Sequence, residues 1–469
     1  MPQTWAISRP DLFVELDPRR VRASLEASLR DAIRTGRLHP GTPVPSSRSL
    51  AADLGIARNT VVEVYGQLVA EGWLNATTGS RTTVSARTAP TLAPSAASPA
   101  GHTVTAADGY ELRGGIPDIS AFPRQAWLAA SRRALQQAPS QVFGYQDPRG
   151  RTELRHALAY YLSRVRGVYV HADQVVICLG AMHGLRLIGK ALRKSGARVW
   201  ATESYGQSWH RQAALQLGFE LRIVPVDDQG AQVEQFGHAN SVMLSPAHQF
   251  PLGVALTPAR RQEAVNWAKT THAIIIEDDY DGEFRHDRRP VGALQSLAPE
   301  HVIYVGTASK SLAPALRLGW MVIPPRLHTA VLEAKSISEG HNSTLAQLTL
   351  AQFIRCGDYD RHIRRSRLRY RHRCDQLAAM LDRFSGLTMQ GIAAGMHALI
   401  ALPEQLAEAP VIEYARQRDL ILEGLSKYAA DPDQQERGPG LVIGYGAPSE
   451  ASYSATLNQL EQTLRHFTK

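Results

Sequence analysis

The sequence predicts two domains of different class: a small helical domain that ends in a β wing, and a large α/β domain built on a parallel sheet. The chain of 469 residues is longer than one hydrophobic core ordinarily organises. Residues 86–108 are rich in Pro, Ala, Ser and Thr and poor in large apolar residues, which is typical of a flexible linker. Beyond the linker, apolar runs alternate with helical segments. We therefore expect domains at residues 1–85 and 109–469.

Charge and cysteine content limit the partners and the compartment. The net charge of +9 permits a polyanionic partner without requiring one. Cys178, Cys356 and Cys374 form no C-x-x-C pair, so we expect reduced thiols in a cytoplasmic protein. No apolar run approaches the roughly 20 residues that cross a bilayer, and acidic residues interrupt the stretch before Pro18. We expect no membrane anchor, no signal peptide and no metal site.

Three helices are expected in the small domain, because apolar residues recur there at helical spacing. These residues are Val21, Leu25, Leu29 and Ile33 in the first helix, Leu50, Ala51 and Leu54 in the second, and Val61, Val64 or Tyr65, and Leu68 in the third. Ser46 is a suitable N-cap for the second helix, which Gly55 ends. Two short strands, 73–74 and 82–84, are expected around a turn at Gly79 and Ser80.

Two short helices joined by a tight turn and followed by a β wing make a winged helix-turn-helix. Its second helix enters the major groove by its first residues, which here are Arg58, Asn59 and Thr60. Arginine and asparagine bond base edges in bidentate fashion, and either can hold a phosphate. The alternative is a three-helix packing module whose polar helix start is merely exposed.

The stretch LRDAIRTGRLHPGTPVPSSRSLAADLGIARNTVVEVYGQLVAEGWL resembles the DNA-binding domain of the GntR-family regulators. The resemblance implies double-stranded promoter DNA as a partner, with Arg48 and Arg58 in contact with bases or backbone. Two positions depart from the family. Ala57 stands where a serine usually caps the recognition helix, and Arg81 stands in the wing tip, where it could reach the minor groove or a phosphate.

The large domain shows apolar runs at 175–177, 198–201, 221–226, 242–244, 273–276, 302–305 and 319–323. Continuous apolar strands that alternate with helices indicate a largely parallel sheet, buried on both faces. Ligands of such sheets bind outside the carboxyl ends of the strands.

Reactive side chains follow several of these runs. The strings are EDDY at 277–280, GTASK at 306–310, SPAHQ at 245–249 and the turn GAM at 180–182. A lysine, a carboxylate, a phenol and a glycine turn that can hold a phosphate are together what pyridoxal phosphate requires. Each feature alone has an ordinary structural explanation, such as an exposed lysine or a helix cap. Their joint order predicts the cofactor.

The joint pattern, over roughly residues 112–467, resembles the class I (fold-type I) aminotransferases. A GntR head joined to such a domain resembles the MocR-type regulators, through SPAHQFPLG, IIIEDDYDGEF and YVGTASKSLAPALRLGW. The resemblance implies that Lys310 forms the Schiff base with pyridoxal phosphate, that Asp278 partners the pyridine nitrogen and that Tyr280 bonds the ring oxygen. The other implied cofactor residues are Arg317, Ser309, Thr307, Gly180, Ala181 and Met182 at the phosphate, Tyr205 stacked on the ring, and His248 and Gln249 near the ring oxygen.

The effector positions depart from the family. Gln207 and Lys427 stand where relatives offer an arginine to the ligand's carboxylate, and His183 follows Met182 in the phosphate turn. The resemblance also implies a homodimer, in which Tyr145 reaches the phosphate of the neighbouring subunit.

Seven arginines lie between residues 360 and 373, in DRHIRRSRLRYRHR. This run is interpreted either as a secondary DNA contact or as a solvated helix of the aminotransferase-like fold.

The sequence therefore favours a pyridoxal-phosphate-dependent transcriptional regulator that senses an amino compound or the cofactor itself. An active aminotransferase with an attached DNA-binding head is the alternative, because the lysine and its supports are all present. A nucleic-acid packaging protein with an inactive domain is a third, more remote interpretation.

Overall fold

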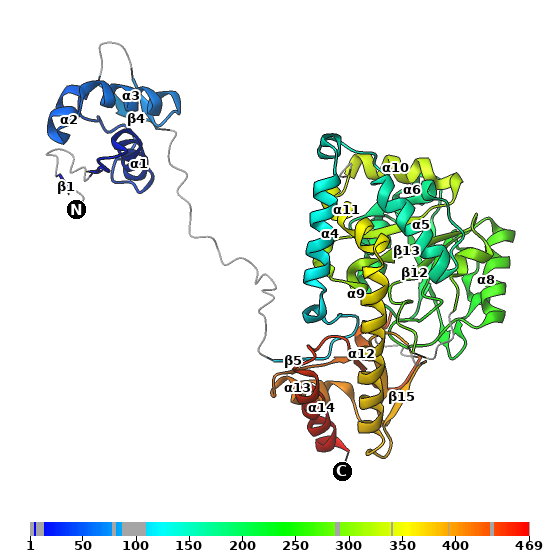
Figure 1. The fold of residues 1–469 in the computed structure, drawn as a ribbon. Helices are drawn as coiled ribbons and strands as arrows, with labels where there is room; N and C mark the ends of the chain where they lie inside the picture. Colours follow the sequence, from blue (N-terminus) through cyan, green and yellow to red (C-terminus); the bar gives the residue numbers. More distant parts are fainter. Residues whose placement is uncertain are drawn as a thin grey trace. The chain divides into compact units, whose positions relative to one another are not determined.

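The computed structural model describes residues 4–5, 14–76, 81–86, 109–286, 291–338, 341–392, 394–431 and 436–468. The chain divides into two compact units, Met1–Thr105 and Ala106–Lys469, which are drawn with their labelled elements in Figure 1. The expected turn at Gly79 and Ser80 and nearly all of the expected linker lie outside the described residues. No helix within the described ranges combines the length and hydrophobicity needed to cross a membrane.

The small unit contains the three expected helices, α1 (Val21–Arg34), α2 (Ser47–Leu54) and α3 (Arg58–Ala70). Their apolar faces share one core that contains Leu25, Leu29, Leu50, Leu54, Val61, Val64 and Leu68. Two antiparallel pairs of strands accompany them, β1 (Thr4–Trp5) with β2 (Val14–Glu15), and β3 (Leu74–Asn75) with β4 (Thr83–Val84). The second pair is the expected wing.

Local sequence explains the turn between α2 and α3. The Ser46 hydroxyl accepts a hydrogen bond of 3.1 Å from the Ser49 amide, so Ser46 caps α2 as expected. Gly55 ends α2 with a φ of 66°, in the left-handed region that glycine adopts readily. Ala57 occupies the N-cap of α3 and offers no side-chain cap. The Thr60 amide donates to the Ala57 carbonyl at 3.0 Å, and the Ala57 side chain offers no acceptor to the amides of Arg58 and Asn59.

The large unit is built on a seven-stranded sheet in the order β6-β14-β13-β12-β11-β7-β8. Its strands are β6 (Val175–Cys178), β7 (Val199–Glu203), β8 (Glu220–Val224), β11 (Ser241–Leu244), β12 (Ile274–Asp279), β13 (Val302–Thr307) and β14 (Gly319–Val322). β14 runs antiparallel to both of its neighbours, and the other pairs are parallel. The expected largely parallel sheet is confirmed, as a mixed sheet with one reversed strand.

Helices bury both faces of this sheet, as its continuous apolar strands predict. Val176 and Ile276 pack on one face, with α6 (Ala181–Lys194), α7 (Ser208–Gln216) and α10 (Pro325–Ser338). Ile177 and Ile275, the next residue after Val176 and the residue before Ile276, face the other side of the sheet. Ile177 packs there with α5 (Thr152–Arg166) and α11 (Thr344–Arg355), and Ile275 packs with α8 (Pro258–Thr271). This alternation directs side chains at the strand ends to opposite sides as well.

A smaller sheet follows the long helix α12 (Asp358–Leu381). Its order is β15-β16-β19-β18, with β15 (Thr388–Gln390), β16 (Ala398–Ala401), β18 (Glu423–Gly424) and β19 (Gly440–Ile443). The remaining elements are α4 (Arg124–Gln137), α9 (Ala308–Ser311), α13 (Glu408–Arg416), α14 (Tyr453–Phe467), the pair β5 (Tyr110–Glu111) with β17 (Leu420–Ile421), and the pair β9 (Val226–Asp227) with β10 (Gly230–Ala231).

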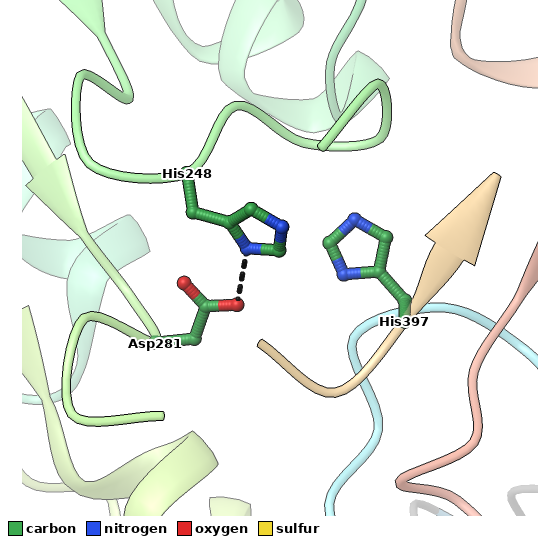
Figure 2. Close-up of side chains that lie close together, drawn as sticks. All are labelled: His248, Asp281 and His397. Carbon is green, nitrogen blue, oxygen red and sulfur yellow. Dashed lines mark hydrogen bonds and ion pairs between the residues drawn. The ribbon is translucent and has the colours of Figure 1, made fainter. Parts of the chain in front are cut away.

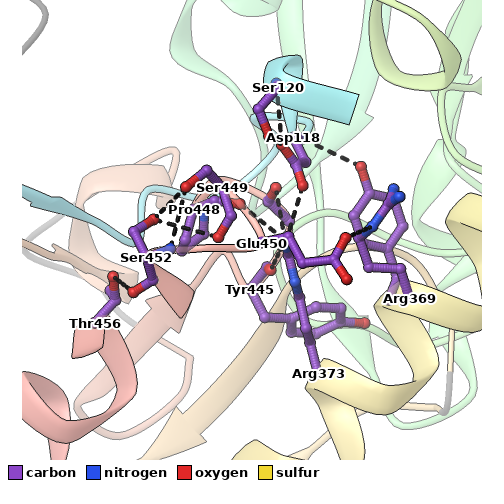
Figure 3. A network of polar contacts seen from close by, with 12 residues as sticks. Asp118, Ser120, Arg369, Arg373, Tyr445, Pro448, Ser449, Glu450, Ser452 and Thr456 are labelled. Carbon is purple, nitrogen blue, oxygen red and sulfur yellow. Dashed lines mark hydrogen bonds and ion pairs between the residues drawn. The ribbon is translucent and has the colours of Figure 1, made fainter. Parts of the chain in front are cut away.

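The arginine run lies on α12, and one of its members is a core residue. Arg373 is 2% exposed and forms an ion pair of 2.9 Å with Asp118, and it donates to the carbonyls of Tyr445 and Pro448 (Figure 3). Asp118 in turn accepts from the Ser120 amide. The interpretation of the run as a solvated helix is wrong at Arg373, which is buried and paired with an anion, whereas Arg361, Arg364, Arg365 and Arg371 are exposed.

Candidate functional site

A cavity of about 160 Å³ opens at the carboxyl ends of the central strands. Every strand of this sheet except β14 ends at this edge, so residues far apart in the sequence meet there. The predicted residues on its wall are Gly180, Ala181, Met182, Tyr205, Gln207, Asp278, Tyr280, Thr307, Ser309, Lys310 and Arg317. The structure thus brings together most of the residues that the sequence assigned to a cofactor.

Lys310 lies on the short helix α9, directly after β13. Its amine donates a hydrogen bond of 2.5 Å to the carbonyl of Gly115. Burial lowers the pKa of this amine, while the carboxylates of Asp278 and Asp281 oppose the shift. A lysine with a lowered pKa holds more of the neutral amine, which is the nucleophilic form.

β12 ends in three consecutive acidic residues, whose side chains point alternately to opposite faces of the sheet and therefore have different partners. Glu277 accepts from the amides of Leu294 and Gln295. Asp279 pairs with Arg166 at 2.7 Å. Asp278, on the opposite side of the strand, lines the cavity. Burial raises the pKa of Asp278 to about 7, with a further contribution from Asp279.

The turn after β6 provides an anion-binding geometry. Gly180 precedes α6 with a φ of 95°, and the amides of the first turn of α6 point out of the helix end. A Cβ atom placed on Gly180 would lie 3.6 Å from Nη1 of Arg317, so the guanidinium stands next to this turn. Ser309 and Thr307 share a hydrogen bond of 3.0 Å at the same end of the cavity.

His183 explains one departure in this turn. Its Nδ1 accepts from the Leu179 amide at 3.1 Å, and burial lowers the pKa of the ring to about 4. His183 is therefore a neutral ring that bonds the chain just before the helix start.

His248 stands behind Tyr280 and is not part of the cavity wall. Its Nδ1 lies 2.8 Å from the Asp281 carboxylate and 3.2 Å from the Tyr280 hydroxyl. Figure 2 shows the ring of His397 beside this pair, with its centroid 4.8 Å from that of His248. One potential ligand atom from each of His248, Asp281 and His397 lies within 4.8 Å of the others, which makes them a possible metal-ligand group among the described residues. The hydrogen bond between His248 and Asp281 already engages two of these side chains.

The structure places Phe250, and not Gln249, on the cavity wall. The side-chain Nε2 of Gln249 donates to the main-chain carbonyls of Tyr205 and Phe250, and its Oε1 accepts from the main-chain amide of Leu252. Its polar atoms therefore shape the loop. Sequence reasoning missed Phe250, because a side chain without polar atoms gave no chemical signal within SPAHQFPLG.

Of the two predicted effector residues, Gln207 lines the cavity and Lys427 does not. The Lys427 side chain is 61% exposed and pairs with Glu423. Tyr145, expected at a subunit interface, is 98% exposed in the single chain. The cavity wall also contains residues that sequence reasoning missed: Gly115, Thr202, Glu203, Gly206, Trp209, His210, Arg211, Met243 and Ser245.

The predicted DNA-contacting residues lie on the surface of the small unit. Arg58 and Asn59 begin α3 and are exposed, as are Arg48 on α2 and Arg81 before β4; Thr60 is half-buried. Four other arginines of this unit, Arg22, Arg30, Arg34 and Arg37, form ion pairs within it: Arg22 pairs with Glu63, for example, and Arg30 with Glu71. Arg48, Arg58 and Arg81 form no such pair within the described part of the chain, so their charges remain available to a polyanion.

Comparison with protein families gives two matches. Residues 22–84 match the family described as bacterial regulatory proteins, gntR family. Residues 116–424 match aminotransferase class I and II.

Curated relatives span nearly the whole chain. The probable rhizopine catabolism regulatory protein MocR of Rhizobium meliloti is 31% identical over 464 residues, which cover 94% of this chain and 93% of that protein. The uncharacterized HTH-type transcriptional regulator YhdI of Bacillus subtilis (strain 168) is 31% identical over 446 residues, 92% of this chain and 93% of that one. The HTH-type pyridoxine biosynthesis transcriptional regulator PdxR of Corynebacterium glutamicum is 29% identical over 473 residues, 97% of this chain and 99% of that one.

Solved structures share the fold of the large unit. Kynurenine aminotransferase from Pyrococcus horikoshii superposes with a TM-score of 0.69 at 23% identity, over 78% of this chain and 92% of that one. The α-aminoadipate aminotransferase LysN from Thermus thermophilus gives 0.67 at 21% identity, over 76% of this chain and 92% of that one. The predicted fold class, a GntR head with a fold-type I aminotransferase-like domain, is confirmed.

Proposed function

The chain belongs to the MocR-type transcriptional regulators of the GntR family, and we propose that its large domain binds pyridoxal phosphate and reports an amino compound, or the cofactor itself, to the DNA-binding head. The observation that carries the proposal is the convergence of Lys310, Asp278 and Arg317 on one cavity. An amine, a carboxylate and a cationic anion site are the groups that this cofactor requires. They come from three separate segments of the chain, so their meeting is a property of the fold.

The residues on the wall fit the parts of the cofactor. When bound, pyridoxal phosphate supplies an aldehyde that condenses with primary amines and a ring that withdraws electrons. Lys310 would offer the amine, Asp278 would hold a proton on the ring nitrogen, and Tyr280 would donate a hydrogen bond to the ring oxygen. The amides of Gly180, Ala181 and Met182 would hold the phosphate, with Thr307, Ser309 and Arg317, and Tyr205 would stack on the ring.

In this proposal, the protein senses its effector because the effector's amine competes with the Lys310 amine for the aldehyde of the cofactor. An incoming primary amine would compete with Lys310 for the bound cofactor, and a released Lys310 amine would be free to donate to the Gly115 carbonyl, as it does in this structure. Gly115 belongs to the segment that directly follows the expected linker. A ligand that makes or breaks the hydrogen bond between Lys310 and the Gly115 carbonyl would therefore affect the part of the large domain that is nearest to the head in sequence. Such a ligand must bind one arrangement more tightly than the other to shift the equilibrium.

An active aminotransferase is the second candidate, because the cavity contains a lysine, an acid and a phenol in the arrangement that the chemistry uses. The relatives named as regulators favour the first candidate. Steady-state assays with amino donors and keto acids distinguish the two.

The test of the cofactor is covalent labelling. Purified protein incubated with pyridoxal phosphate should absorb visible light, and borohydride reduction followed by peptide mapping should find a pyridoxyl group on Lys310. Lys310→Ala should remove the label and weaken retention of the cofactor without abolishing it, because the phosphate contacts remain. A label on another lysine, or no label, contradicts the proposal.

We further propose a cytoplasmic homodimer in which two heads bind two half-sites of promoter DNA. Tyr145, exposed in the single chain, is available to reach the partner's phosphate site. Sedimentation of the full chain checks the dimer, and a monomer at micromolar concentration contradicts it.

A further inference from the structure

Arg211 is a half-buried arginine on the wall of the cavity, in the first half of α7. Its guanidinium donates to three main-chain carbonyls: to Ala429 at 2.9 Å, to Gly206 at 3.2 Å and to Tyr428 at 3.4 Å. These bonds tie α7 to the segment after β18. They hold the guanidinium in one place, so the side chain is already positioned for a ligand.

No carboxylate neutralises Arg211 among the residues that the structure describes. Two almost completely buried arginines behave differently: Arg166 pairs with Asp279 at 2.7 Å, and Arg373 pairs with Asp118 at 2.9 Å. Burial alone lowers the pKa of Arg211, with no contribution from an acid. Arginine nevertheless stays charged in proteins, so an uncompensated positive charge faces the cavity.

The guanidinium of Arg211 retains two N–H donors beyond its three hydrogen bonds to main-chain carbonyls, and they lie on neighbouring nitrogens. Nη1 uses two bonds and Nη2 uses one, which leaves the Nε hydrogen and one Nη2 hydrogen of the five that a guanidinium carries. Nε and Nη2 are the same two nitrogens through which Arg166 holds both oxygens of Asp279. Arg211 thus retains the edge that binds oxyanions in bidentate fashion.

The other positive charges of the cavity have separate roles. In the proposed function Lys310 and Arg317 serve the cofactor. Burial lowers the pKa of His210 to about 3, so this ring is neutral. Lys427 lies outside the wall, paired with Glu423. Arg211 is therefore the cation on the described wall that remains for the effector.

We infer that Arg211 binds the anionic end of the effector, which is a primary amine that carries a carboxylate or a sulfonate. The inference rests on the proposed function, in which the amine end of the same molecule meets the cofactor at Lys310. It excludes diamines and uncharged alkylamines as effectors.

Calorimetric titration of the full-length, cofactor-loaded protein tests the inference. The probes are 3-aminopropanoate, 4-aminobutanoate and 5-aminopentanoate, their alkylamine counterparts without the carboxylate, and 3-aminopropanesulfonate. At least one amino acid should bind about tenfold or more tightly than its alkylamine, as expected for a charged hydrogen-bonded pair. Comparison of the carboxylate with the sulfonate then identifies the preferred oxyanion.

Variants assign the effect to the residue. Arg211→Gln should reduce the amino acid to the affinity of its alkylamine and leave the alkylamine unchanged. Arg211→Lys keeps the positive charge but loses the pair of neighbouring N–H donors, so the amino acid should bind with an intermediate affinity. The matched control is Arg132→Gln on the exposed face of α4, which should change neither affinity.

Cofactor labelling of the same variants separates the two hypotheses. The inference requires that Arg211→Gln and Arg211→Lys keep the borohydride label on Lys310. Loss of the label in both variants, or equal affinity of wild type for amino acids and alkylamines, overturns the inference and leaves the cofactor proposal standing. A wild-type protein that takes no label overturns both.

Discussion

The amine of Lys310 donates a 2.5 Å hydrogen bond to the main-chain carbonyl of Gly115. The bond joins the reactive end of α9 to the segment that connects the large domain to the linker. Asp278 and Asp281 act on the same amine through their charges. The protonation of this amine therefore depends on the Gly115 carbonyl and on two carboxylates, that of Asp278 in β12 and that of Asp281 just after it.

Cofactor uptake should depend on pH through Lys310. Burial lowers the pKa of its amine, so the neutral form that attacks an aldehyde appears at a lower pH than in an ordinary lysine. The initial rate of pyridoxal phosphate uptake, followed by absorbance, should rise with pH through a midpoint that lies below the midpoint of a free lysine peptide. Asp278→Asn removes a carboxylate that favours the ammonium form, so its profile should move to lower pH. A midpoint equal to that of a free lysine peptide contradicts this account.

Asp278 should make the cofactor-free protein less stable as the pH rises. Burial raises its folded pKa to about 7, whereas an unfolded aspartate titrates near 3.9. The folded state therefore holds an extra proton between these values, and this contribution to stability is full below pH about 4 and lost as the pH rises through about 7. Melting temperatures of cofactor-free wild type and Asp278→Asn should diverge in favour of the variant between pH 5 and 8. A constant difference contradicts the prediction, and the comparison cancels other titrating groups such as Glu277.

DNA binding should depend on Arg58 and not on Arg22. Arg58 is exposed at the start of α3 and has no acidic partner in the described head, whereas Arg22 pairs with Glu26 and Glu63. Arg58→Ala should weaken binding to the native promoter by about 1–3 kcal/mol at fixed salt, and Arg22→Ala serves as the matched control. Titration of unrelated DNA shows whether Arg58 meets a base or a phosphate, since a phosphate contact weakens both. Unchanged promoter affinity in Arg58→Ala would mean that α3 is not the recognition helix.

The buried pair of Arg373 and Asp118 should matter far more than its exposed neighbours on α12. Arg373→Met leaves Asp118 as an unpaired buried charge and should cost about 3–5 kcal/mol. Arg371, whose side chain is 46% exposed and 4.0 Å from Asp375, is the control, and Arg371→Met should cost less than about 1 kcal/mol. Chemical denaturation measures both. Adding Asp118→Asn to Arg373→Met should recover part of the loss, and no recovery would argue against a role for the charge.

Strand order and side-chain alternation made much of the cavity predictable. The runs that precede Gly180, Asp278 and Lys310 belong to strands whose ends meet at one edge of the sheet, so their order in the sequence already indicated a common site. Period-two alternation also separates Asp278 from Asp279, which faces Arg166. The predicted helices and wing of the head followed in the same way from local apolar spacing and from Ser46 and Gly55.

Roles that depend on distant partners could not be read from the sequence. Arg373 looks like any other arginine of its run until Asp118, 255 positions away, is placed against it. Gln249 has the chemistry of a ligand group, but neighbouring carbonyls use its amide. Arg211 carried no motif, because its carbonyl partner Ala429 comes from another part of the chain.

Transamination should be slow or absent, even when an amino compound binds. Productive transamination requires that the Cα–H bond of the substrate stand perpendicular to the cofactor ring, which needs a firm hold on the substrate carboxylate close to that carbon. A bidentate arginine provides such a hold, whereas a glutamine has no charge and a lysine is a point charge. Gln207 and Lys427 stand at the positions where the family resemblance places that arginine, and Lys427 is turned to Glu423.

A cavity with this composition binds its ligand without aligning it for proton removal. A sensor also benefits from slow chemistry, because an effector that is consumed cannot report its own concentration. Stopped-flow spectra with a panel of amines should therefore show a shift of cofactor absorbance and no accumulation of pyridoxamine phosphate over minutes. Gln207→Arg adds an arginine at the position where the family resemblance places one, in addition to Arg211, and should raise the rate of conversion for α-amino acids, while Lys427→Arg, outside the wall, should leave it unchanged. Conversion by wild type within seconds, with continued turnover once a keto acid is added, would instead identify the protein as an aminotransferase that carries a DNA-binding head.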